Sequence, residues 1–225
     1  MLVLVVDSST PAVTAALVEV TADGVATRAH RCTVDARAHG ELLAPQVDAV
    51  LADADARPGD LSAIVVGLGP GPFTGLRVGL VTAATMGQVL RIPTYGVCSL
   101  DGIGYPAAAG EPVLAASDAR RREVYWAVYD GGGQRIAGPN VDAPVVAAER
   151  ARDLAATVAV GDGAHRYADV LGLPVREEPR YPDATALVGL AAERIRAGAP
   201  SERLTPLYLR RPDAVAATGH KPVLP

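Results

Sequence analysis

Runs of apolar residues alternate with turn signals through the first hundred residues of the chain. Apolar positions three and four apart predict two helices, over residues 39–54 and 74–90. The order of strands and helices predicts an α/β lobe with a mixed sheet and helices on its faces. Strand-like runs rich in β-branched residues occupy residues 2–6, 13–20, 25–34, 62–66 and 94–97.

A second series of predicted elements begins after residue 103. Asp183 suits the N-cap of the last helix, and Gly198 suits its C-terminal stop. Residues 211–225 contain three prolines and no periodicity, so we expect an extended or mobile tail there. We therefore expect two lobes, residues 1–103 and 104–210, followed by this tail. Strands are predicted at residues 112–117, 123–129 and 157–161, and helices at 147–156, 164–171 and up to about 197.

The charged residues of the chain disfavour two functional classes, free-standing nucleic-acid binders and enzymes that use a lysine. The formal net charge is -4, and Lys221 is the only lysine among 21 basic residues. A free-standing nucleic-acid binder normally carries a surplus of positive charge, and lysine-based chemistry needs a lysine in an ordered site. Both classes are therefore disfavoured. A hydrophobic fraction of 49% is ample for a buried core.

Targeting and redox features favour a cytoplasmic protein. No apolar run approaches the ~18 residues of a membrane-spanning helix, and Asp7 comes too early for a secretory signal peptide. Cys32 and Cys98 lie far apart in the sequence, and we expect two reduced thiols. The four histidines show no short ligand spacing, so we expect no zinc site.

The glycine-rich segment of residues 67–75, GLGPGPFTG, lies between a predicted strand and a predicted helix. Backbone N–H groups and a helix N-terminus can bind an anion at such a place. The segment lacks the lysine of a P-loop, and its prolines remove donors, so a rigid turn is the favoured alternative. Asp7 has the same two interpretations, a metal- or phosphate-facing carboxylate or a turn cap. The candidate positions for this loop are Asp7, Ser9, Gly69, Gly71 and Thr74.

Small residues recur every four positions along the helix predicted after this loop. Each interior glycine costs a helix about 1 kcal/mol relative to alanine, so we expect another backbone to pack closely against them. That backbone belongs either to the same chain or to another subunit, and the sequence leaves both alternatives open. The stripe consists of Gly75, Gly79, Ala83 and Gly87.

An arginine-rich turn, DARRRE at residues 118–123, separates two predicted strands. Its arginines are suited to recognise phosphate or carboxylate. The alternative is a solvated turn whose charge the flanking acids neutralise. The candidate polar contacts are Asp118, Arg120 and Glu123.

Five motifs occur in a fixed order along the chain. They are DSST at 7–10, HGELL at 39–43, GPGPFTGLRVG at 69–79, DAR with EVYW at 118–126, and PLYLR at 206–210. Together they resemble the TsaB (YeaZ) family. The resemblance spans about residues 1–210. One departure is Pro72, where the family usually has serine, and the change removes a hydroxyl and a backbone donor from the glycine loop.

The resemblance implies a fold of the actin/Hsp70/sugar-kinase type, with two ribonuclease H-like lobes. It implies a non-catalytic scaffold or activating subunit of the complex that makes N6-threonylcarbamoyladenosine at position 37 of tRNA. The implied partners are the catalytic subunit TsaD and the ATPase TsaE, with a homodimer in the absence of TsaD and tRNA reached mainly through the complex. No cofactor of its own is implied, and a nucleotide would bind only at a junction with partner subunits.

The resemblance also bears on individual residues. TsaD binds its metal through two histidines spaced His-x-x-x-His, and the corresponding positions here are Ser99 and Ile103. It therefore implies neither a metal site nor catalytic residues in this chain. It further implies a four-helix interface, in which the helix near His39 and the helix after the glycine loop pair with their counterparts in TsaD or a second copy. The candidate interface positions are His39, Leu43, Val47, Val50, Gly75, Gly79, Ala83 and Gly87.

Two other functional classes are alternatives. An ATP-binding phosphotransferase of the same superfamily would place Asp7 and the glycine loop at the phosphates. A protease would need a nucleophile with a base, or a metal pair, and the sequence supplies neither in a recognisable motif.

Overall fold

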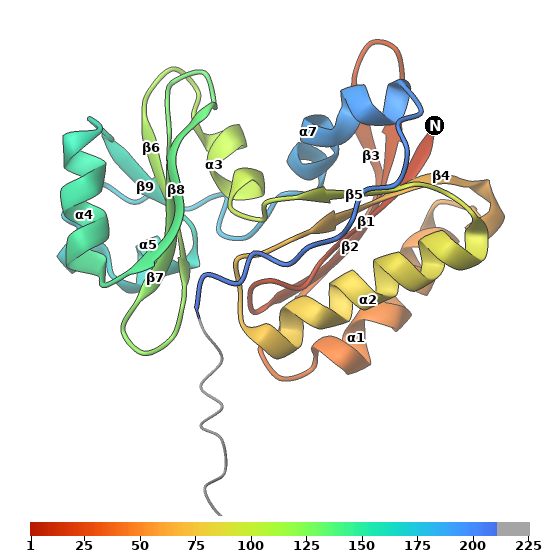
Figure 1. Cartoon of the computed structure of the whole chain (residues 1–225), viewed down its shortest axis with the longest axis horizontal. Helices are drawn as coiled ribbons and strands as arrows, with labels where there is room; N and C mark the ends of the chain where they lie inside the picture. The colour runs from red at the N-terminus through yellow and green to blue at the C-terminus, as the bar shows by residue number, and fades with distance from the viewer. Residues whose placement is uncertain (211–225) are drawn as a thin grey trace, which may run out of the picture.

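The computed structural model describes residues 1–210, which form two lobes with a sheet in each (Figure 1). The first sheet has the strand order β3-β2-β1-β4-β5. Its strands are β1 (Leu2–Asp7), β2 (Ala12–Val20), β3 (Val25–Val34), β4 (Leu61–Gly67) and β5 (Thr94–Val97). Because β1 pairs antiparallel with β2 and parallel with β4, the sheet is mixed, as predicted.

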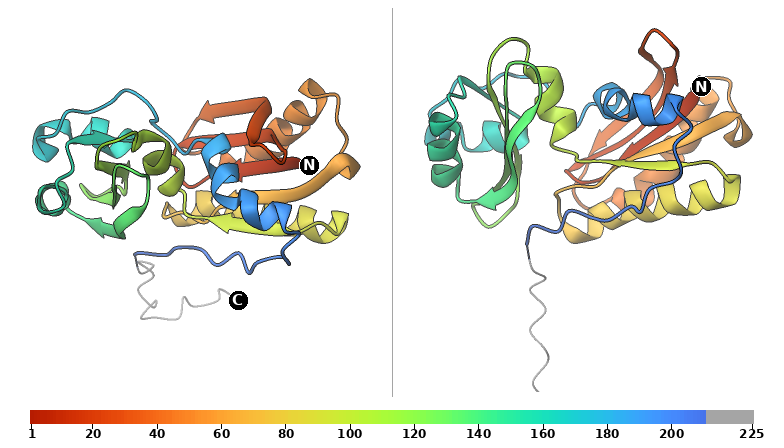
Figure 2. Two further views of the ribbon diagram at one scale, coloured as in Figure 1. Left: turned by 90° about the horizontal axis from the view of Figure 1, so that it is seen from above. Right: turned by 45° about the horizontal axis from the view of Figure 1, so that its top comes forward.

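Alternating side chains of the first sheet build two apolar layers, because successive residues of a strand point to opposite faces. Leu4 and Val6 belong to the layer covered by α1 and α2, and Val3 and Val5 belong to the layer covered by α7. Figures 1 and 2 show α1 and α2 below the sheet and α7 above it. The helical segments are α1 (His39–Asp53), η1 (Pro58–Asp60), α2 (Phe73–Leu90) and α7 (Ala184–Arg196).

Helix α7 belongs to the first lobe, whereas the predicted division places residues 104–210 in the second. Leu187 and Val188 of this helix are fully buried against the first sheet. The chain then returns along β5, where the Glu202 N–H donates to the Thr94 carbonyl at 2.9 Å. An amphipathic pattern does not reveal which of two sheets a helix covers, so the predicted end of the second lobe is corrected here.

The second sheet has the strand order β8-β7-β6-β9. Alternation along β7 sends Trp126 into the layer beneath α4 and its neighbour Tyr125 into the layer on the other face. The strands are β6 (Val113–Asp118), β7 (Val124–Tyr129), β8 (Arg135–Asp142) and β9 (Val158–Val160). The helices are α3 (Asp101–Ala107), α4 (Pro144–Asp153), α5 (Asp162–Arg166) and α6 (Ala168–Leu171).

Two of these elements are missing from the sequence-based prediction. Every residue of β8 is exposed or only partly buried, so the strand has no apolar alternation to detect. Helix α3 has seven residues with Pro106 inside, fewer than the roughly 11 residues over which a helical apolar pattern is read. In addition, the helix predicted at residues 164–171 is divided into α5 and α6, and α4 begins earlier than predicted, at Pro144.

The signals at the ends of α7 are confirmed. The Asp183 side chain accepts a hydrogen bond from the Ala186 N–H at 2.7 Å, and Gly198 has a left-handed φ of 60° just after the helix. The mixed α/β fold with two lobes is likewise confirmed. The tail predicted at residues 211–225 lies outside the described residues. None of the helices within residues 1–210 is long and apolar enough to cross a membrane.

Candidate functional site

Asp7 ends β1 beneath the glycine loop and is enclosed by its own chain. One carboxylate oxygen, Oδ1, accepts hydrogen bonds from the Ser9 N–H at 2.9 Å and the Ser9 hydroxyl at 2.7 Å. The other oxygen, Oδ2, accepts from the Ser99 hydroxyl at 2.6 Å. Burial raises the pKa of Asp7, and the hydrogen bonds from Ser99 and Ser9 oppose that rise. This arrangement is that of a carboxylate which caps a turn.

Backbone contacts hold the glycine loop tightly against the segment after β1. A Cβ atom added to Gly71 would lie 2.0 Å from the Ser9 carbonyl oxygen, so only glycine fits. Gly69 has a φ of 87°, and its N–H donates to the Ser99 hydroxyl at 3.1 Å. Thr74 lies apart from this contact, exposed in the first turn of α2. The loop is therefore built as a rigid turn, and a phosphate-facing role for it stays a prediction.

The stripe of small residues on α2 packs against the chain's own first lobe. The Ser8 hydroxyl donates to the Gly75 carbonyl at 2.8 Å and accepts from the Gly79 N–H at 2.9 Å. A Cβ atom on Gly79 would lie 2.6 Å from the Ser8 oxygen, and one on Gly87 would lie 2.4 Å from Cγ2 of Thr94. The close neighbours of the stripe therefore belong to the same chain, and at Gly79 and Gly87 they are side chains and not the backbone that the sequence predicts.

The other predicted interface positions are internal as well. His39 is buried, and its Nε2 lies 2.8 Å from the Thr10 carbonyl oxygen. A partner subunit can contact only exposed residues, so the prediction of these eight positions as a partner interface is corrected. The physical reason is that Ser8, His39 and Thr94 of the same chain fill the space beside the glycines of the stripe. The core formed by α1, α2 and the first sheet includes Leu43, Val47, Val50 and Ala83.

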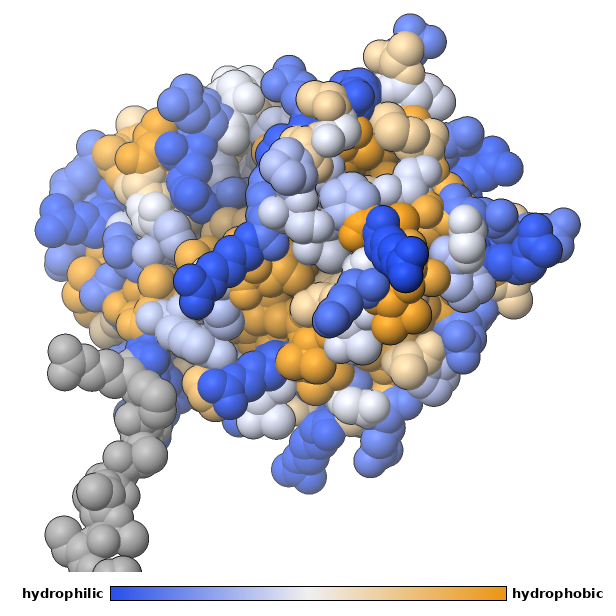
Figure 3. Space-filling model, turned by 45° about the vertical axis from the view of Figure 1, so that its right-hand side comes forward, coloured by the Kyte–Doolittle hydropathy of each residue, from blue (hydrophilic) through white to orange (hydrophobic). Residues whose placement is uncertain are grey.

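The opposite side of α2 carries a second series at the same four-residue spacing. We call it the outer stripe of α2. Val81 and Val89 in this stripe are 62% and 74% exposed, and Phe73 at its start is 40% exposed. Figure 3 shows apolar residues gathered on the face of the molecule that it views. The stripe consists of the exposed residues Phe73, Arg77, Val81, Thr85 and Val89.

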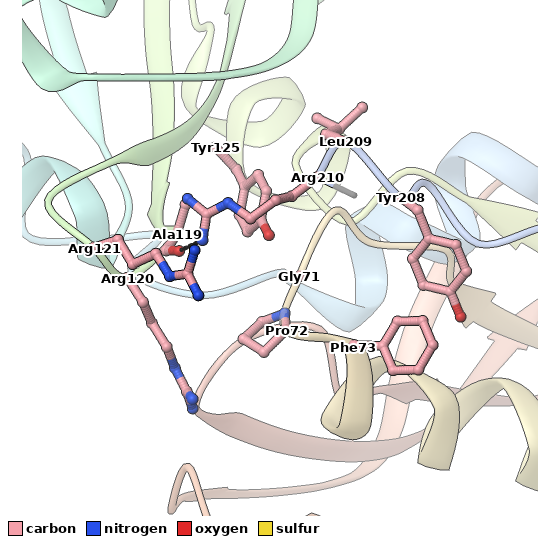
Figure 4. A pocket seen from close by; sticks show the side chains of 10 residues that line it. All are labelled: Gly71, Pro72, Phe73, Ala119, Arg120, Arg121, Tyr125, Tyr208, Leu209 and Arg210. Atoms are coloured by element: carbon pink, nitrogen blue, oxygen red, sulfur yellow. Dashed lines mark hydrogen bonds between the residues drawn. The ribbon is translucent and has the colours of Figure 1, made fainter. Parts of the chain in front are cut away.

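A cavity of about 400 Å³ lies between the lobes, and we call it the interlobe cleft (Figure 4). The glycine loop and the start of α2 form one wall, and the turn between β6 and β7 forms another. The segment after α7 supplies the remaining residues. The lining consists of Gly71, Pro72, Phe73, Ala119, Arg120, Arg121, Tyr125, Tyr208, Leu209 and Arg210.

Three consecutive arginines occupy the turn between β6 and β7, which we call the arginine hairpin (residues 119–123). Arg120, Arg121 and Arg122 have φ values of 58°, 53° and 60°, a left-handed conformation that side chains with a Cβ atom disfavour. The Ala119 N–H donates to the Glu123 carbonyl, and the Glu123 N–H donates to the Arg120 carbonyl, each at 3.0 Å. Strained backbone of this kind clusters at functional sites.

The structure brings the predicted polar contacts together at this hairpin. Asp118 forms an ion pair with Arg166 at 3.2 Å, and Glu123 pairs with Arg210. The Arg120 N–H donates to the Asp118 carboxylate at 3.3 Å, while Arg120 itself lines the interlobe cleft. The two acids therefore serve the chain's own structure, and contact of Arg120 with a ligand or partner stays a prediction.

Sequence reasoning missed an aromatic contact that lines this cleft, between the start of α2 and the segment after α7. The rings of Phe73 and Tyr208 stack with their centroids 4.9 Å apart. Both residues lie within the family motifs, and aromatic residues make up only 4% of the chain. Their rarity was the available signal, but no sequence pattern indicates which two aromatic residues meet.

Metal and thiol chemistry have little support among residues 1–210. No group of three or more His, Cys, Asp or Glu in this range is placed to hold a metal ion. Ser99 is occupied by its hydrogen bond to Asp7, and Ile103 is fully buried in the core. The two cysteines are free, and burial raises the pKa of the Cys98 thiol to about 12, far from a reactive thiolate.

The chain is similar to proteins of one family over most of its length. The family model described as TsaD, tRNA N6-adenosine threonylcarbamoyltransferase, matches residues 32–189. An uncharacterized protein of Mycobacterium leprae is 47% identical over 96% of this chain, which spans only 57% of that relative. The tRNA threonylcarbamoyladenosine biosynthesis protein TsaB of Escherichia coli is 32% identical, covering 77% of this chain and 81% of that protein.

A solved structure agrees with the sequence matches. YeaZ from Pseudomonas aeruginosa superposes with a TM-score of 0.72 at 27% identity, over 92% of this chain and 100% of that one. These similarities agree with the two-lobe fold and with the order of the motifs, and all three indicate the same family. The chain belongs to the TsaB (YeaZ) family.

Proposed function

We propose that this chain is a non-catalytic partner subunit in the biosynthesis of N6-threonylcarbamoyladenosine in tRNA. The pathway is the one named for its Escherichia coli relative. In this proposal TsaD, the threonylcarbamoyltransferase of the matching family model, performs the transfer. The present chain binds TsaD and, with it, the ATPase TsaE.

The observation that carries the proposal is the outer stripe of α2. Val81 and Val89 expose most of their side chains in the middle and at the end of a helix whose other side is fully packed. Covering apolar surface is favourable by about 25 cal/mol per Å², so such a stripe gains from a partner. A straight helix with residues four apart on its surface presents ridges that fit the grooves of another helix.

Two contacts inside the first lobe support a non-catalytic role. The Asp7 carboxylate already accepts three hydrogen bonds from Ser9 and Ser99, which leaves about one acceptor site for a metal or a phosphate-bound water. Ile103 cannot ligate a metal. An ATP-using phosphotransferase with Asp7 at the phosphates is therefore the weaker alternative.

The proposal also covers self-association, tRNA, nucleotide and location. The outer stripe serves a homodimer when TsaD is absent, because one surface can pair with its own copy about a twofold axis. Contact with tRNA is mainly indirect, which a net charge of -4 supports. A nucleotide binds only at a junction with a partner subunit, and the complex works in the cytoplasm.

Size-exclusion chromatography of the purified chain with TsaD from the same organism tests the proposal. We expect the two to elute together as one complex. Two separate peaks of folded proteins would overturn the partner role. Calorimetry of the isolated chain with Mg-ATP tests the alternative, because micromolar binding accompanied by turnover would show an enzyme and not a scaffold.

A further inference from the structure

An extended segment, residues 199–210, follows α7 and crosses the molecule from the first lobe towards the second; we call it the strap. Figures 1 and 2 show it passing along β5. The Glu202 N–H donates to the Thr94 carbonyl at 2.9 Å, and the Leu207 N–H donates to the Leu68 carbonyl at 2.8 Å. The strap is thus fixed to the edge of the first sheet and to the start of the glycine loop.

An aromatic clamp holds the strap just before it leaves the first lobe. Tyr208 stacks on Phe73 with an interplanar angle of 30°. The guanidinium carbon of Arg77 lies 3.5 Å from the centroid of the Phe73 ring, and its Nε donates to the Tyr208 hydroxyl at 2.9 Å. Three side chains therefore tie the strap to the first two turns of α2.

Arg210, two residues further, makes its contacts with the second lobe. Its Nη1 donates to the Ala119 carbonyl at 3.0 Å, a bond drawn in Figure 4, and its guanidinium pairs with the Glu123 carboxylate. These two partners stand at the two ends of the arginine hairpin. The Arg210 side chain, which is 25% exposed, therefore contacts the residues on either side of the three left-handed arginines.

These contacts connect the lobes independently of the chain segments before β6 and after β9. Left-handed backbone at residues with a Cβ atom persists only where its surroundings determine it. Here the hairpin's own hydrogen bonds close the turn, and Arg210 fixes the closed turn to the first lobe. The same side chain also forms part of the lining of the interlobe cleft.

We propose that the strap is a latch between the lobes and that Arg210 is a positioning residue for the arginine hairpin. It holds the hairpin in its left-handed conformation and places Arg120 at the interlobe cleft. Loss of the Arg210 contacts frees the hairpin, while the aromatic clamp keeps the strap on the first lobe. The latch belongs to the isolated chain and does not depend on which partner the chain binds.

Hydrogen exchange measured by mass spectrometry on the full chain tests the latch. In Arg210→Ala we expect amides of the arginine hairpin to exchange about 10-fold faster or more, because a charged hydrogen-bond donor is lost at one end of the turn and an ion pair at the other. Amides of β1 and β4 should keep their wild-type rates. The matched control is Arg203→Ala, which removes an exposed arginine from the same strap and should change neither region.

A second variant approaches the same contact from the second lobe. Glu123→Gln keeps the size of the side chain and removes its charge, so hairpin exchange should rise in the same direction, and the double variant should exceed Arg210→Ala by little. Unchanged hairpin exchange in both single variants would overturn the latch. Equal acceleration in the hairpin, β1 and β4 would overturn it too, because it would show a general loss of stability. If Arg210→Ala does not fold, Glu123→Gln decides alone.

Discussion

Single residues on α2 show why glycine recurs where a helix would prefer alanine. Ser8 is buried, and its hydroxyl is held by two hydrogen bonds, to Gly75 and from Gly79. A Cβ atom at Gly79 would lie 2.6 Å from that hydroxyl oxygen, so the oxygen could not move aside without losing both bonds. The glycines thus admit a side chain that joins α2 to the end of β1.

Gly79→Ala should therefore destabilise the fold. We expect the free energy of unfolding in urea to fall by about 1–3 kcal/mol, the usual cost of overpacking a core. The matched control is Gly189→Ala in the interior of α7, where no heavy atom lies within 4 Å of the added Cβ. That substitution should raise the free energy of unfolding by about 0.5–1 kcal/mol. Equal effects at both sites would contradict this account of the stripe.

Asp162 gives the stability of the second lobe a pH dependence. Burial raises its pKa from 3.8 to about 6, the nearby Asp118 charge adds to the rise, and Arg180 opposes it. Between these two values the folded chain holds a proton that the unfolded chain has released. The stability contributed by this group therefore falls as the pH rises through that window.

Asp162→Asn removes the titration while keeping an oxygen that can accept the same hydrogen bonds. The free energy of unfolding of the variant, measured against that of the wild type, should increase as the pH is raised from about 4 to about 6, and level off above. Urea unfolding of both proteins at several pH values measures this difference. A difference that stays constant across the window would show that Asp162 is not the titrating group.

Helix α2 carries two stripes on opposite faces, and the residues of each stripe recur every four positions. The inner stripe of small residues is closed by the first sheet, and the outer stripe is open. Val81→Glu should leave the fold intact, because Val81 is 62% exposed, yet place a charge in the proposed interface. We expect the affinity for TsaD to fall at least about 10-fold, since an unpaired charge buried in an interface is costly.

The control for this variant is Val145→Glu on α4. Val145 is 50% exposed on the second lobe, away from the outer stripe, and a carboxylate is tolerated in the first turn of a helix. Binding measured by interferometry or calorimetry should match that of the wild type. Loss of binding in both variants, or in neither, would show that the outer stripe is not the contact surface.

The elements also show how far the sequence predicts this fold. Strands with strong apolar runs, such as those predicted at residues 2–6 and 13–20, are placed to within one residue at each end, because burial on the sheet imposes the pattern. β8 escapes detection because its residues are exposed or only partly buried, and because Gly138 and Pro139 within it are poor strand formers. At the candidate site, the sequence identifies that α2 has a close neighbour at Gly79. It cannot identify the neighbour as Ser8, since that depends on how distant segments pack.

On the scale of the whole molecule, the first lobe is assembled from both ends of the described chain. Residues 1–97 supply all five strands, but α7 near the other end covers one face of their sheet. Leu187, Val188 and Ile195 of α7 are nearly or fully buried there. At roughly 1.5–3 kcal/mol for each large side chain, these three contribute about 5–9 kcal/mol, which is comparable to the net stability of a typical domain. The second lobe is thus inserted into the first.

A chain ending at residue 183 should consequently fail to form a stable first lobe. It would expose the face of the sheet that carries Val3 and Val5, so we expect non-cooperative unfolding and binding of a dye that reports apolar surface. A peptide of residues 184–210, which contains α7 and the strap, should restore a cooperative transition when added in excess. Cooperative unfolding of the shortened chain without the peptide would contradict this prediction, because it would show that the first lobe folds without α7.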